Sequence, residues 1–346
     1  MSTATPIQRK RDNPGEPERN GGPTSFGSRK RLDSDFGELA AVTVTPPVET
    51  VYNRWYATPK LKADALHAEV RRMKAELGTG HGWASMLHTK AKFPTYSLEN
   101  ILILSDQAGG ELTRVAKYAK WQLLGRQVTK GVKGYAILDS KRVRVQLMDN
   151  VGRPLLDEMG LPRRGNALTS EPTTSTVFDV SQTSGPELPA EQRKLSSAPP
   201  ARLIEDLTRA VENLGFEIVY EKMTEKGLFG YTDNDRRVVL REGASATSHA
   251  RALAHELGHI TAGHVDRFDY TGGHGGHGGR AEAEAHSIAY TLLIAKGMKA
   301  DPASEPAAII GAWDRPDQAT VVAAAQNIHQ AVRGLFHETK WANAAV

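Results

Sequence analysis

Apolar residues recur at helical spacing in the first half of the chain. From Leu66 to Leu77 they fall every three or four residues, which predicts an amphipathic helix. A second helix is predicted over residues 97–106, with Ser97 as its N-cap, and a third from Thr113 until Gly125 ends it. This region therefore begins as a helical one.

Short runs rich in β-branched residues follow and predict strands. They cover residues 135–138, 142–147 and 176–180, and the polar stretch 149–174 lies between the second run and the third. Helices followed by strands indicate a small α+β domain.

The second half has a different order of elements. The pattern predicts helices over 201–214, 248–261, 280–290 and 318–336, and strands over 216–220 and 236–240. In this half a helix and a sheet are followed by a helix that contains His255-Glu256-Leu-Gly-His259 and by a helix that contains Glu284. This order is the layout of a minimal zincin, a metallopeptidase-like domain built around HExxH.

Composition divides the chain into four parts. Residues 1–50 are rich in Pro, Gly, Ser and charged residues and are expected to be a disordered basic tail. The small α+β domain is expected over 51–180, a Ser/Pro-rich linker over 181–200, and the zincin-like domain over 201–340. The predicted fold class is thus α+β with two domains, and the length allows a separate core for each.

Several classes of protein are excluded or disfavoured by composition. The chain has no cysteine, which excludes disulfides, thiolate metal sites and a cysteine nucleophile. No apolar run is long enough to span a membrane, and the basic N-terminal region does not resemble a secretory signal. We therefore expect a soluble cytoplasmic protein without a membrane partner.

The formal net charge of +4 is unevenly distributed. The first 200 residues carry a net charge of +8 and the remainder a net charge of −4. Lys90 to Val145 holds 11 basic residues against 4 acidic ones. Such an excess favours a polyanionic partner, although a solvated charged surface is an alternative.

The most specific motif is His255-Glu256-Leu-Gly-His259, an HExxH sequence inside a predicted helix. Two imidazoles four residues apart lie one turn apart on one helix face, the spacing that a single Zn²⁺ needs. Glu256 is then placed to accept a proton from water at the metal. The alternative is that both histidines are ordinary helix residues.

A catalytic zinc needs a third protein ligand, and the predicted helix over 280–290 offers two. Glu284 shares the apolar stripe of that helix, where a buried carboxylate requires a partner, and it is the preferred candidate. Glu282 lies nearer the polar side. Mn²⁺, Fe²⁺ or Co²⁺ would also suit two imidazoles and a carboxylate. The other nearby histidines are not expected to be ligands, and the Gly/His segment 272–279 is expected to be a flexible loop.

These motifs resemble two families. From about residue 201 the chain resembles the ImmA/IrrE metallopeptidases and the zincin half of the antirestriction protein ArdC, through the HExxH motif with Gly263-His264 and through Glu284 to Tyr290. The first half resembles the single-stranded DNA-binding domain of ArdC. The matching segments there are Tyr96-Ser97, Asn100 to Ile103, Trp121 to Val128 and Lys130 to Leu138.

The resemblance implies His255, His259 and Glu284 as metal ligands and Glu256 as the general base. It also implies a strand-binding surface in which basic residues neutralise phosphates and aromatic faces stack on bases. The residues expected there are Tyr96, Arg114, Lys117, Lys120, Trp121, Arg126, Lys130, Lys133 and Tyr135. For each aromatic residue, and for Trp121 in particular, packing in the core is the alternative.

Two functional hypotheses follow from these observations. In the first, a zinc-dependent metallopeptidase joined to a single-stranded DNA-binding domain protects incoming plasmid or phage DNA or cleaves a regulator protein. In the second, the metal site is structural or vestigial and protection comes from coating the strand. A basic half that binds duplex DNA or a protein is a third possibility, and the peptide substrate stays unidentified.

Overall fold

The computed structural model describes residues 49–108, 112–188, 195–266, 279–299, 305–313, 316–338 and 341. The predicted disordered tail, up to residue 48, and the Gly/His segment, up to residue 278, lie outside the described residues. Helices and strands are mixed in both halves of the chain, so the predicted α+β fold class is confirmed.

Three helices open the first half. They are α1 (Pro59–Glu76), α2 (Gly80–Lys92) and α3 (Leu98–Ala108). The predicted apolar stripe of α1 is buried, and the Thr58 hydroxyl caps the helix by accepting a hydrogen bond from the Leu61 N–H. Ser97 Oγ accepts from the Asn100 N–H at 3.2 Å, which confirms the predicted N-cap of α3. Helix α2 was not predicted.

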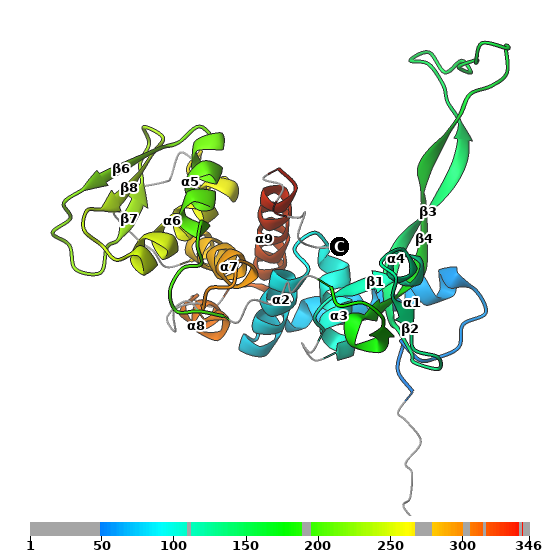
Figure 1. The fold of residues 1–346 in the computed structure, drawn as a ribbon, viewed down its shortest axis with the longest axis horizontal. Coiled ribbons are helices and arrows are strands. Elements are labelled where there is room, and N and C mark those ends of the chain that lie inside the picture. Colours follow the sequence, from blue (N-terminus) through cyan, green and yellow to red (C-terminus); the bar gives the residue numbers. More distant parts are fainter. Residues whose placement is uncertain are drawn as a thin grey trace, which may run out of the picture. The chain divides into compact units, whose positions relative to one another are not determined.

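An antiparallel sheet follows, in the strand order β1-β4-β3. Its strands are β1 (Val115–Lys117), β3 (Tyr135–Gln146) and β4 (Arg164–Asp179), and β3 and β4 form a long hairpin (Figure 1). The smaller elements beside it are α4 (Tyr118–Leu123), β2 (Gln127–Val128), the 3₁₀ turn η1 (Val180–Gln182) and β5 (Thr183–Ser184), which pairs with β2.

The helix predicted from Thr113 to Gly125 is therefore wrong in its extent. Thr113 does not cap it, because its N–H and hydroxyl both donate to the Asp179 carboxylate. Val115 to Lys117 pairs with β4 instead, and only six residues remain helical. Strand pairing with a distant part of the chain outweighs local helix propensity here.

The end of the β3–β4 hairpin contains a sequence repeat of eight residues. Asp149 Oδ1 accepts hydrogen bonds from Val151 N and Arg153 N, and Asp157 Oδ1 accepts from Met159 N and Leu161 N. The same Asp-x-x-Gly turn is thus used twice. The polar stretch expected over 149–174 consists of these two turns and the first part of β4.

The second half begins with α5 (Leu203–Asn213), and a sheet follows in the order β6-β8-β7. Its strands are β6 (Glu217–Glu221), β7 (Gly230–Thr232) and β8 (Arg237–Arg241), with β6 parallel and β7 antiparallel to β8. Four helices complete the half: α6 (Ala246–Thr261), α7 (Arg280–Ala295), α8 (Pro306–Ala312) and α9 (Gln318–Glu338). Only β7 and α8 were not predicted.

The two halves share one large hydrophobic core, although the length of the chain allows a separate core for each. A single cluster of buried residues includes Trp83 of α2 together with Leu292 of α7 and Val332 of α9. Polar contacts reinforce this packing, since Trp83 Nε1 donates to Ser287 Oγ at 3.0 Å and Tyr290 Oη lies 2.6 Å from His88 Nε2. Residues from Glu49 onward accordingly form one compact unit.

None of the helices in the described residues is long and apolar enough to cross a membrane.

Candidate metal centre

Helix α6 carries both histidines of the HExxH motif. Its N-terminus is capped by Ser245, whose hydroxyl accepts from the Ser248 N–H, and the helix continues past His259 to Thr261. The Nε2 atoms of His255 and His259 lie 3.1 Å apart, as expected for residues one helical turn apart on one face. His259 is buried and His255 nearly so.

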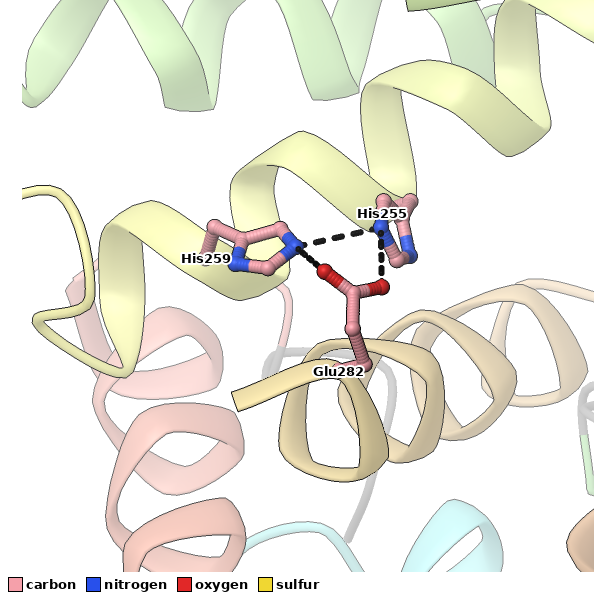
Figure 2. Close-up of side chains that lie close together, drawn as sticks. All are labelled: His255, His259 and Glu282. Atoms are coloured by element: carbon pink, nitrogen blue, oxygen red, sulfur yellow. Dashed lines mark hydrogen bonds and ion pairs between the residues drawn. The ribbon is translucent and has the colours of Figure 1, made fainter. Parts of the chain in front are cut away.

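Glu282, in the first turn of α7, completes the group. Its carboxylate reaches across to both rings, with Oε1 3.1 Å from His259 Nε2 and Oε2 3.4 Å from His255 Nε2 (Figure 2). One ligand atom from each of the three residues lies within 4.8 Å of the others. Two imidazole nitrogens and one carboxylate oxygen at this spacing fit a zinc ion that keeps one position open.

The charges of the three side chains depend on one another. Burial alone raises the pKa of Glu282, but hydrogen bonds with His255 and His259 outweigh it, so the pKa lies well below its ordinary value. Burial lowers the pKa of His259 and thereby favours the neutral ring, the form that binds a metal. Burial also acts to lower the pKa of His255, but the hydrogen bond with Glu282 and the nearby carboxylates raise it overall.

Glu284, which the sequence favoured as the third ligand, does not lie in this group. Its carboxylate is buried and contacts His264 Nε2 at 2.9 Å, and it also accepts from Arg280 and Asn327. Residues two apart on a helix point in widely different directions, so only one of the two glutamates can face the histidine pair. The structure therefore places Glu282, and not the predicted Glu284, beside the histidine pair.

Glu284 is nevertheless connected to the histidine pair. His264 Nδ1 lies 3.1 Å from His259 Nδ1, and His264 Nε2 contacts the Glu284 carboxylate. One assignment of protons satisfies both contacts: His259 Nδ1–H donates to His264, and His264 Nε2–H donates to Glu284. This tautomer leaves the lone pair of His259 Nε2 directed at the metal position.

Glu256 is buried beside the pair. Its Oε2 accepts a hydrogen bond of 2.8 Å from the hydroxyl of Thr232, a fully buried residue of β7. Thr232 was not identified from the sequence, since a single threonine in a short strand carries no recognisable signal. The sheet thus fixes the orientation of the predicted general base.

Gly258, inside the motif, lets α6 and α7 approach closely. A Cβ added at this position would lie 2.7 Å from the carbonyl oxygen of Ala285, which is closer than real contacts allow. The close approach of the two backbones brings the start of α7 within reach of α6. A glycine is therefore needed at position 258, because any side chain would collide with the backbone of α7.

The sequence matches two family models. Residues 63–174 match the N-terminal domain of the anti-restriction factor ArdC, and residues 211–301 match the IrrE N-terminal-like domain. The first match lies in the helical and hairpin half of the chain, and the second includes the His255–His259 motif and Glu282.

Two solved structures of the antirestriction protein ArdC from plasmid R388 are similar to this chain. The metal-free structure has 21% sequence identity and a TM-score of 0.40, over 70% of this chain and 84% of that one. The Mn(II)-bound structure has 20% identity and a TM-score of 0.35, over 70% and 83%. No curated protein matches the sequence significantly.

Within the part of the chain that matches the ArdC model, four of the residues predicted to bind DNA contact other residues of the protein. Trp121 is fully buried, and its Nε1 donates to the Phe178 carbonyl at 2.9 Å. Arg126 clamps the turn after β5 through Thr183, Gly185 and Pro186. Lys117 forms an ion pair with Asp139. Tyr96 packs against Phe93, and burial raises the pKa of Tyr96 to about 12.

The other five residues of that set differ in position. Lys120 and Lys130 are exposed, and Arg114 is partly buried. Lys133 and Tyr135 line a cavity together with residues that precede and begin α1. Of the residues predicted to bind DNA, Lys133 and Tyr135 thus line the same hollow.

Proposed function

We propose that this chain is an antirestriction protein of the ArdC type, with a single-stranded DNA-binding domain and a metal-dependent peptidase centre. The observation that carries the proposal is the convergence of His255, His259 and Glu282 beside Glu256. Both family matches agree with it.

The residues divide the chemistry between them. When bound by His255, His259 and Glu282, Zn²⁺ supplies Lewis acidity toward water and a peptide carbonyl; Mn²⁺, Fe²⁺ or Co²⁺ would suit the same donors. Glu256 accepts the proton of the attacking water and returns it to the leaving amine. Thr232 holds the carboxylate of Glu256, and His264 with Glu284 holds the ring of His259.

The single-stranded DNA partner is supported by the ArdC-type domain and by the basic excess between Lys90 and Val145. A protein that neutralises phosphates binds more weakly as the salt concentration rises. The role in antirestriction would follow either from occupying the strand or from cleaving a protein at it.

The test compares the unmodified chain with Glu256→Gln in two assays. The first measures hydrolysis of a denatured protein such as casein, after metal loading. The second measures survival of DNA during digestion by a restriction enzyme. We expect Glu256→Gln to keep its metal and to lose hydrolysis by a factor of about 10² to 10⁴.

The two assays separate the hypotheses. Hydrolysis at an unchanged rate in Glu256→Gln would overturn the mechanism. Protection of DNA that survives both Glu256→Gln and the loss of the metal would leave strand occlusion as the function. Equal protection and equal binding of duplex and single strands would contradict the proposed partner.

A further inference from the structure

An open hollow of about 710 Å³ lies in the first half of the chain, and none of its lining residues belongs to the candidate metal centre. It is bounded by the segment before α1, by the end of α3 and by the start of β3. Its volume falls within the range of small-ligand sites, roughly 300 to 1,000 Å³. Lys133 and Tyr135, both predicted to contact DNA, line it.

The segment before α1 adds an aromatic face that the sequence did not single out. Trp55 lines the cavity and is 82% exposed, whereas Trp83, Trp121 and Trp313 are buried. Exposure of a large ring at the edge of a cavity leaves its face open to a ligand.

The backbone around Trp55 is held in place. Tyr52 Oη donates to Asp106 of α3 at 2.6 Å, and the Arg54 N–H bonds to the Thr50 carbonyl at 3.0 Å. These contacts fix the turn that presents the ring. The backbone that carries Trp55 is therefore ordered before any ligand arrives, which reduces the entropic cost of binding.

The cavity also has a net positive charge. Arg54, Lys62 and Lys133 line it against one carboxylate, Asp106, which already contacts Tyr52 and Arg72. Within the described part of the chain, Lys62 and Lys133 form no ion pair. A phosphate group is a suitable counterion for such a pair of ammonium groups.

Gly134 and Gln107 form another part of the cavity wall. At Gly134 a Cβ would lie 2.5 Å from Thr176 Cγ2 and 2.6 Å from the Val177 carbonyl oxygen, so no side chain can occupy the space. The Gln107 amide is engaged with both backbone groups of Ala136. Such a wall offers few free groups to read the edge of a base.

We propose that this cavity binds one nucleotide of a single DNA strand, with its base against Trp55 and its phosphate between Lys62 and Lys133. The assignment rests on the proposed function and names the part of the domain that performs it. Stacking needs an unpaired base, so a single strand fits and a duplex does not. Because stacking and charge dominate, binding is independent of sequence.

The test measures the anisotropy of a fluorescein-labelled oligo-dT with the full chain over a series of salt concentrations. Trp55→Ala is expected to weaken binding by about tenfold, and Trp55→Phe to retain most of the affinity, because a ring is kept. Replacing both Lys62 and Lys133 by Gln should lower the slope of log Kd against log salt by about 1.4.

Lys60→Gln is the matched control. It removes the same charge from the same helix, but Lys60 pairs with Asp64 at 2.9 Å and does not line the cavity. We expect its affinity and salt slope to be unchanged. Thermal unfolding followed by circular dichroism establishes that each variant is folded.

The outcomes separate the inference from the proposed function. If the unmodified chain binds oligo-dT but Trp55→Ala and the double lysine variant bind equally well, the cavity is not the site and the proposed function stands. If the folded unmodified chain binds no oligo-dT, both are overturned. Duplex competing as well as oligo-dT would also overturn stacking on Trp55.

Discussion

His264 Nε2 lies 2.9 Å from Glu284 Oε2, and both side chains are buried. The contact satisfies the carboxylate that the apolar stripe of α7 had suggested as a metal ligand. It also explains how two glutamates separated by one residue have different tasks. Glu282 faces His255 and His259, and Glu284 contacts His264, which in turn contacts the ring of His259.

The two glutamates are expected to respond differently to substitution. Glu282→Ala should abolish stoichiometric metal binding, because it removes one of three ligands. Glu284→Gln should retain the metal with an affinity lowered by about 10- to 100-fold, the usual effect of a residue that orients a ligand. Metal content by mass spectrometry and competition with a chelator measure both effects. Loss of metal from Glu284→Gln alone would restore Glu284 as the ligand.

Thr232→Val tests whether the sheet orients the general base. The substitution removes the hydroxyl that donates to Glu256 and nearly conserves volume, so we expect kcat to fall by about tenfold while metal content is unchanged. Thr291→Val is the matched control, since its hydroxyl is equally buried but bonds to the Ser287 carbonyl on α7. An unchanged kcat in Thr232→Val would contradict this role.

Gly258→Ala should damage both the fold and the metal centre. The added methyl group meets the Ala285 backbone, and overpacking of this kind costs about 1 to 3 kcal/mol of the free energy of unfolding. Separation of α6 from α7 should also weaken metal binding. The comparison is Gly334→Ala in α9, where the added Cβ would meet no atom within 4 Å apart from the helix's own backbone. There alanine should raise the free energy of unfolding by about 0.5 to 1 kcal/mol. Urea unfolding gives both values, and equal stability of Gly258→Ala and the parent would disprove the close approach.

His329 is expected to make stability depend on pH. Burial, together with the positive charges of Lys90 and Arg333, lowers the pKa of His329 to about 4 in the folded protein, below the 6.5 of a free imidazole. Its contribution is complete above pH 6.5 and is lost as the pH falls toward 4, because only the unfolded chain takes up the proton readily. The expected loss is up to about 2 kcal/mol.

His329→Gln should show a smaller loss over the same range, because glutamine does not titrate there. Its side-chain oxygen can still accept from Lys90 Nζ, which lies 2.9 Å from His329 Nδ1, so the contact is kept. Urea unfolding at pH 7 and pH 4.5 compares the two proteins. Parallel loss of stability in both would assign the acid sensitivity to other groups.

Much of the fold could be predicted from the sequence because its helices have strong apolar stripes and caps. The predicted helix 248–261 became α6 (Ala246–Thr261), and the strand predicted over 236–240 became β8 (Arg237–Arg241). Helix α2 was missed because glycines at positions 80 and 82 disguise its start. The short β7 carries too few residues for a period to emerge.

The site was harder to predict. An apolar stripe on a helix indicates which side chains are buried, but it does not indicate which group a buried carboxylate contacts. Most of α7 is buried on more than one face, which leaves the polar and apolar sides of the helix poorly distinguished. The preference for Glu284 followed from that ambiguity. The burial of Trp121 was equally hard to predict. Trp121 is fully buried and Leu123 is 83% exposed, and this difference depends on packing against residues far away in sequence, such as Phe178.

The packing of Trp83 and Lys90 of α2 against α7 and α9 has a consequence for how such proteins diversify. Recombination that exchanged the gene segment for one domain would expose apolar surface on both products, unless the exchanged piece carried matching side chains. The two domains are therefore expected to be inherited together, and substitutions on either side of their shared core to compensate for each other.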